Sequence, residues 1–296
     1  MTDGALIADS LRPILRHEIA VARQKLAEAR GSLAPVHKAK SARPFIMQIH
    51  KAEQHFIAPL TKALQLGLDP QQLADRWLSR VSKAADGKKA ARAFVMSLKP
   101  DSADLQASLE ALYGAGHVIG AAEAKEFLVR GGVEPTVREL DAQVATIDWS
   151  KWTPGTREAT AELADLEGSQ CLQTLLDGTG RQVSSLQDTQ VGEIASILAD
   201  AADDGATVDD LAAEIGAYFD DPNRAELIAT TELNRAVTAC TLDTYGANDI
   251  DEFSVLVYDP CPICGDQEAN NPHLLNEDSP PFHPRCRCAV TPVLSE

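Results

Sequence analysis

Four cysteines and a histidine lie close together near the end of this 296-residue chain. Cys261 and Cys264 form a Cys-x2-Cys pair, and 18 residues separate this pair from the group His283, Cys286 and Cys288. Two residues between ligands allow one tight turn to present both side chains to the same ion, and two such turns give the tetrahedral set that zinc prefers. The distance between the two half-sites is typical of zinc modules. The sequence therefore predicts a zinc site.

Five candidate ligands compete for the four positions around a tetrahedral zinc ion. Cys261 and Cys264 are the first choice, while His283, Cys286 and Cys288 remain alternatives for the other two positions. Four protein ligands leave no open position, so we expect the zinc to be structural. Disulfide bonds are the alternative, but the N-terminus lacks the features of a secretory signal, and reducing compartments keep thiols free.

An enzymatic role is a further alternative for this cluster. The segment from Pro260 to Cys264 matches half of the zinc-deaminase signature, but no histidine is followed two residues later by glutamate. His283 as the general base of a nuclease would require additional metal ligands. The loop between the half-sites is acidic and would repel phosphate, which disfavours nucleic-acid binding through this element. The remaining cysteines, Cys171 and Cys240, lie on separate helical patterns and are expected to be buried structural thiols.

The elements that position the cluster are predicted to be mainly helical. Aromatic residues make up only 5% of the chain, and apolar residues recur at helical spacing. Asp221 suits an N-cap and Pro222 suits the first position of the clearest helix. Alternating apolar residues from Phe253 to Val257 predict a short strand. The expected helices cover residues 7–26, 45–66, 70–81, 101–131, 156–176, 184–202, 208–218 and 222–245, and residues 289–294 are expected to form a partner strand.

The length of the chain suggests two domains. The segment 148–155 is either a domain boundary or a packed corner between helices. We expect residues 1–150 to form a helical, basic-leaning N-terminal region and residues 151–296 to form a small α+β domain with a structural zinc site. The net charge of −17 is uneven, because residues 1–100 carry +9 and residues 101–296 carry −26. No apolar run is long enough to predict a transmembrane helix.

Three segments of the second half resemble a known family. They are RAELIATTELNRA from Arg224 to Ala236, YDPCPIC at 258–264 and PPFHPRCRC at 280–288. In order and spacing they are similar to the C-terminal domain of phage Mu F-like minor head proteins, also called phage head morphogenesis proteins. The resemblance extends over roughly residues 155–294, and the long acidic loop between the half-sites departs from it. It implies a minor component of a tailed-phage head that associates with the portal and is not an enzyme.

Five further residues of this motif, Arg224, Thr231, Glu232, Arg235 and Asp259, have a predicted structural role. Arg224 and Glu232 are two helical turns apart, and Glu232 and Arg235 are three residues apart and can pair. We expect Glu232 and its neighbours to hold the helix against the zinc turn, with Asp259 as a partner. The alternative is an exposed ion pair that contributes well under ~1 kcal/mol.

The predicted function is that of a minor capsid or head morphogenesis protein, located at the portal vertex of the virion head and in the host cytoplasm during assembly. Its expected partner is the portal protein. Major capsid or scaffold proteins, and packaged DNA bound through the basic N-terminal third, are further candidates, and no membrane is expected. The alternatives are a metal-dependent nuclease or nucleotide-modifying enzyme, and a cytosolic zinc-containing interaction module from a prophage.

Overall fold

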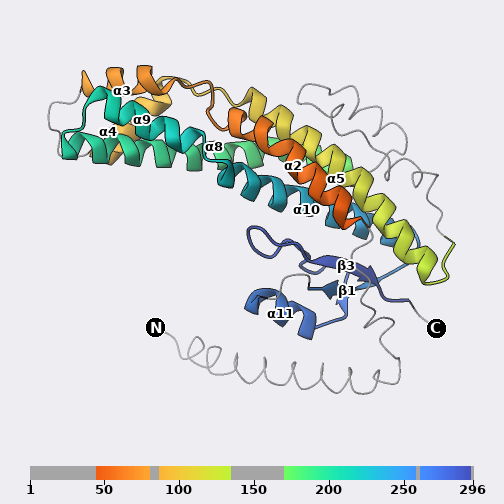
Figure 1. Ribbon diagram of the computed structural model, residues 1–296. Coiled ribbons are helices and arrows are strands. Elements are labelled where there is room, and N and C mark those ends of the chain that lie inside the picture. Colours follow the sequence, from red (N-terminus) through yellow and green to blue (C-terminus); the bar gives the residue numbers. More distant parts are fainter. Residues whose placement is uncertain (1–44, 81–86, 135–169, 258–260, 295–296) are drawn as a thin grey trace, which may run out of the picture. The chain divides into compact units, whose positions relative to one another are not determined.

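The protein is mainly helical and ends in a small antiparallel sheet (Figure 1). The computed structural model describes residues 45–80, 87–134, 170–257 and 261–294. The described helices are α2 (Ile46–Ala63), α3 (Pro70–Leu78), α4 (Gly87–Ser97), α5 (Ala103–Arg130), α8 (Gln170–Asp204), α9 (Val208–Phe219), α10 (Pro222–Gly246) and α11 (Pro262–Ala269). The strands are β1 (Glu252–Leu256), β2 (His273–Leu274) and β3 (Ala289–Pro292). The predicted fold class is therefore confirmed.

Helices α5 and α10 pack closely along each other (Figure 1). The contact depends on Gly116 and Gly120 of α5, because a methyl group at either position would overlap Ala236 or Val237 of α10. The Thr241 hydroxyl of α10 donates hydrogen bonds to the carbonyl oxygens of Gly120 and Val237. Small residues thus set the distance at which these two backbones meet.

Helix α2 packs against both α5 and α10. Helix α3 packs mainly against α9, and helix α4 packs against α8. The Trp77 indole N–H donates to the Leu198 carbonyl at 2.7 Å, which fixes α3 against α8. The Gln190 side-chain amide of α8 likewise donates to the Leu64 carbonyl at the end of α2, at 2.7 Å. One hydrophobic core runs through these helices and includes residues from 49 to 237.

One predicted cap of α10 agrees with the structure and the other differs by one residue. The Asp221 carboxylate accepts from the Asn223 amide at the start of α10, as expected, whereas Gly246, which suits a C-cap, is the last helical residue and Ala247 is the C-cap. At the start of α5, the N-cap residue is Ser102, but its side chain makes no capping bond. The Asp101 carboxylate accepts from the Ala103 amide instead. Helix α4 was not predicted.

Residues 170–204 form one continuous helix, α8, where the sequence predicted two. Residues 178 and 180 are glycines, and the prediction interrupted the helix around them. The predicted helix at 7–26, residues 156–169 of the predicted helix 156–176, the segment 148–155 and the boundary at residue 150 lie outside the described residues. Helices from both sides of that boundary contribute to the same core. Within the described ranges, no helix combines the length and apolar character needed to cross a membrane.

The small sheet has the strand order β2-β1-β3, and both pairings are antiparallel. Ser254 lies opposite Thr291 in the β1–β3 register, which confirms the predicted strand pair. Phe253 and Val255 point into a second hydrophobic cluster together with Tyr245 at the end of α10. The Tyr245 hydroxyl donates to the Val290 carbonyl at 3.2 Å. The sheet is thereby fixed to the C-terminal end of α10.

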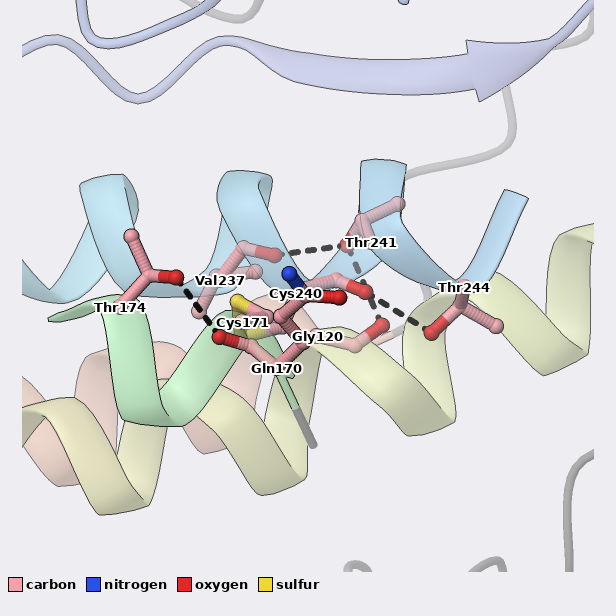
Figure 2. Close-up of a disulfide and its surroundings, with 8 residues drawn as sticks. All are labelled: Gly120, Gln170, Cys171, Thr174, Val237, Cys240, Thr241 and Thr244. Atoms are coloured by element: carbon pink, nitrogen blue, oxygen red, sulfur yellow. Dashed lines mark hydrogen bonds between the residues drawn. A yellow bond between two sulfur atoms is a disulfide. The ribbon is translucent and has the colours of Figure 1, made fainter. Parts of the chain in front are cut away.

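Cys171 and Cys240 form a disulfide between the first turn of α8 and the middle of α10 (Figure 2). The expectation of two separate buried thiols is wrong, although both residues are buried. Their Cα atoms lie 5.6 Å apart, well within the range that a disulfide bridges. The two residues are 69 positions apart, so only the packing of α8 on α10 brings them together.

Candidate metal centre

Two tight turns carry the five predicted metal ligands. Cys261 is the N-cap of α11, and its sulfur accepts from the Cys264 amide at 3.3 Å. In the second turn, the Cys286 amide donates to the His283 carbonyl at 3.1 Å. Arg285 adopts the left-handed φ of 61° that this turn requires. Cys288 follows directly and leads into β3.

The turns bring all five residues into two overlapping groups. Cys261, Cys264 and His283 form one, and Cys264, Cys286 and Cys288 form the other, with the donor atoms of each group within 4.8 Å of one another. His283 Nε2 lies 3.3 Å from Cys261 Sγ and 3.1 Å from Cys264 Sγ, and Cys264 Sγ lies 3.8 Å from Cys286 Sγ. Zinc–sulfur bonds of about 2.3 Å in a tetrahedron place two sulfurs about 3.8 Å apart. The donor set and its spacing therefore fit a metal ion.

The orientation of His283 suits a ligand. Its Nδ1 lies 2.8 Å from the Pro284 carbonyl oxygen, which can only accept a hydrogen bond. The proton of the neutral ring is thus held on Nδ1, and the lone pair of Nε2 faces the sulfurs of Cys261 and Cys264. Both nitrogens are therefore committed within the cluster.

Burial and hydrogen bonding give the thiols different proton affinities. The backbone amide of Cys264 holds the pKa of Cys261 below its usual value. A hydrogen bond from the Cys288 thiol lowers the pKa of Cys286 to about 5, whereas burial raises the pKa of Cys264 to about 12. The cluster thus offers a thiolate at neutral pH, and a bound cation would promote deprotonation of the buried Cys264 thiol.

Residues of the packed helices α2 and α10, which belong to the helical layer formed by α2, α5, α8 and α10, hold the second turn in place. The Arg285 amide donates to the Thr231 hydroxyl of α10 at 3.0 Å, and the Asn234 amide group donates to the Cys288 carbonyl at 3.2 Å. Arg287 forms an ion pair with Glu53 of α2 at 3.0 Å. Asn234 and Glu53 were not among the predicted site residues. The place of Asn234 inside the motif helix was a signal for it, but nothing in the sequence around Glu53 marked that residue.

Glu232 is almost fully buried, at 3% exposure, so the alternative of an exposed ion pair is wrong. Its carboxylate accepts from the Tyr113 hydroxyl of α5 at 2.8 Å, from the Gln182 amide of α8 at 2.9 Å and from Arg235 at 3.1 Å. Burial, followed by this neighbouring carboxylate, raises the pKa of Tyr113. These bonds hold α10 against other helices and not against the metal turn, so the expected role of Glu232 at that turn belongs instead to its neighbour Thr231.

The other two motif residues have different positions. The Arg224 guanidinium lies over the Tyr218 ring, 4.3 Å from its centroid, and so links the first turn of α10 to α9. Asp259 lies outside the described residues, so its predicted contact with Glu232 stays a prediction.

The cluster is chemically suited to hold a soft or borderline metal ion through thiolates and one imidazole. Each of the two groups offers three donor atoms, and Cys264 belongs to both. No protein-family model, curated protein or solved structure matches this chain.

Proposed function

We propose that this protein is a minor head protein of a tailed phage, of the head-morphogenesis type, and that it docks at the portal vertex. One observation supports this above all: the segments that carry the resemblance meet in space. Thr231 and Asn234 of the motif helix hydrogen-bond to the backbone of Arg285 and Cys288 in the closing Cys/His turn. Residues that contact one another in this way depend on one another, so we expect the three segments to occur together, as the motifs of one family do.

The metal in this proposal is structural zinc. Thiolates combined with one imidazole at tetrahedral spacing are typical of zinc, and hard cations such as Mg²⁺ prefer oxygen ligands. The ion would join α11 to the turn before β3 and so close the C-terminal element. His283 would hold the ion or support its ligands, and both of its nitrogens are already engaged. This arrangement disfavours a role for His283 as the general base of a nuclease.

The uneven charge of the chain suggests which part contacts which partner. The basic first third of the chain is a candidate for contact with DNA or with an acidic surface of the portal. The acidic remainder would repel packaged DNA. Capsid or scaffold proteins are further candidates, with assembly in the host cytoplasm and a final position in the virion head.

Mass spectrometry of density-purified particles tests this proposal. We expect a few to a few dozen copies of this chain for each particle. Cross-linking of the same particles should then join the chain to the portal protein. A Cys264→Ser variant, which removes the ligand shared by both groups, should reduce incorporation, whereas Ile263→Ser, an exposed neighbour, should not. Absence of the chain from particles at every stage of assembly would overturn the proposal.

A further inference from the structure

Helix α8 contains an intrinsically weak segment near its start. Gly178 and Gly180 lie inside the helix, and each glycine costs roughly 1 kcal/mol relative to alanine in a helix interior. A methyl group at either position would meet no atom within 4 Å, so close packing does not require glycine there. Close packing therefore does not explain why this part of α8 contains two glycines.

Two anchors to α10 flank this glycine pair. Before it, the disulfide joins Cys171 to Cys240 (Figure 2). After it, Gln182 donates to the buried Glu232 carboxylate at 2.9 Å. The first anchor is covalent and chemically reversible, while the second is independent of the redox state. The first anchor lies on the part of α8 that precedes the glycines.

The disulfide is next to open space. Cys171 lines a cavity of about 730 Å³ between the start of α8 and the end of α10, together with Thr174, Asp243 and Leu275. This hollow opens widely to solvent, so a small solute can enter it. Cys240 does not line the cavity, so a reagent that enters it approaches the disulfide from the side of Cys171.

We propose that the Cys171–Cys240 disulfide is a thiol-exchange site that controls a hinge at Gly178 and Gly180 of α8. The reactant is a small-molecule thiol of the glutathione class. Its thiolate attacks Cys171 Sγ, which forms a mixed disulfide and releases the Cys240 sulfur as a thiolate that takes up a proton. A second thiol attacks the sulfur of the first, which forms the free disulfide of the reactant and releases the Cys171 thiol.

Reduction removes the covalent attachment of residues 170–177 to α10. Leu172 is fully buried, so this segment remains docked most of the time, but the glycine pair allows it to open without the rest of α8. Opening exposes the face of α10 around Cys240. Where the disulfide form of the reactant is abundant, the same two exchange steps run in reverse, release two molecules of the reactant thiol and re-form the Cys171–Cys240 bond, which holds the segment on α10.

Hydrogen exchange of the full, metal-loaded chain tests this hinge. Reduction, or the double variant Cys171→Ser with Cys240→Ser, should speed exchange of amides 170–177 by about tenfold or more. Amides 190–204, beyond the second anchor, should not change. The double variant leaves the four cysteines of the metal cluster intact, so its result does not depend on their redox chemistry.

Alanine substitutions distinguish a hinge from general loosening. In the reduced protein, Gly178→Ala and Gly180→Ala should each slow the opening of residues 170–177 by about fivefold. Gly216→Ala on α9, where a methyl group also meets no atom within 4 Å, is the matched control and should have no effect there. Glutathione disulfide added to the reduced chain should give a mixed disulfide at Cys171, seen by peptide mass spectrometry.

Three results would overturn the proposal. They are unchanged exchange at 170–177 after reduction, an equal increase at 190–204, and an adduct found on Cys240 but never on Cys171. None of them bears on the proposed role in the phage head, because the particle experiments do not depend on the disulfide.

Discussion

The α5–α10 helix pair and the C-terminal segment 261–288 keep their shapes by different means. Large apolar side chains such as Leu109, Leu112 and Ile119 are fully buried in the helical layer. Between residues 261 and 288, in contrast, no leucine, isoleucine, valine or phenylalanine is buried, while three cysteines are. Burial of apolar surface stabilises the first region, whereas a metal ion held by the Cys/His ligands would supply the stability that the second region lacks. We therefore expect the stability of this protein to have two separate sources.

Loss of the metal should give the largest effect and separate the two regions. We expect Cys264→Ser to reduce bound zinc from one ion to none and to remove the hydrogen-exchange protection of residues 261–294. The parts of α5 and α10 that belong to the main core, up to Ala122 and Val237, should keep their protection, because that core does not include the cluster. Ile263→Ser, an exposed position between two ligands, is the control and should retain zinc. Full zinc content in Cys264→Ser would contradict the assignment.

Overpacking the helical layer should give the opposite pattern. In Gly120→Ala, the added methyl group would overlap the backbone of Val237, so we expect the free energy of unfolding to fall by about 3 kcal/mol. Urea denaturation followed by circular dichroism measures this loss. The same substitution at Gly216 has free space and should not destabilise the protein. Equal effects of the two substitutions would refute the close contact between α5 and α10.

Acid should weaken the helical layer through His117 of α5. Burial lowers the pKa of His117 to about 4, so the unfolded chain binds a proton at a higher pH than the folded chain does. Stability is complete above the usual histidine pKa of about 6.5 and falls as the pH decreases towards 4, by up to about 3 kcal/mol. Thermal unfolding of the wild type and of His117→Gln at several pH values measures this term. A wild-type pH profile that matches the variant would exclude it.

Loss of the buried carboxylate at the centre of the helical layer should have a smaller effect. Glu232→Ala removes the acceptor of Tyr113 and Gln182, and we expect a loss of about 2 kcal/mol in unfolding free energy with zinc still bound. Calorimetry and metal analysis of the same sample provide both readouts. A variant that unfolds like the wild type, or that loses zinc, would contradict this role.

The ion pair that links the two regions should give the smallest effect. Glu53 is buried in α2, while Arg287 lies between two candidate ligands and is partly exposed, so solvent screens their attraction. We expect a coupling energy of about 1 kcal/mol from a double-mutant cycle with Glu53→Gln and Arg287→Ala. Zinc removal should reduce this coupling, because the turn that carries Arg287 is then loosened. A coupling that is unaffected by zinc would mean that the two regions are independent.

Features that depend on near neighbours in the chain were predictable. The Cys-x2-Cys turn, the start of α10 at Asp221 and Pro222, and the alternation in β1 follow from local backbone geometry. Helix α11 was missed because its eight residues lie in a loop of acidic and small residues without a helical apolar pattern. The single helix α8 was missed because contacts with α4 and α10 outweigh the cost of its two glycines.

The sequence by itself determined the helical character, the strand pair and the set of five metal-ligand candidates, because each depends on residue type and short spacing. The tertiary structure decided which distant residues are partners. It joined Cys171 to Cys240, surrounded Glu232 with Tyr113 and Gln182, and paired Glu53 with Arg287. The physical reason is that these contacts form only when helices far apart in the chain pack their apolar faces together, and local patterns do not specify which faces meet.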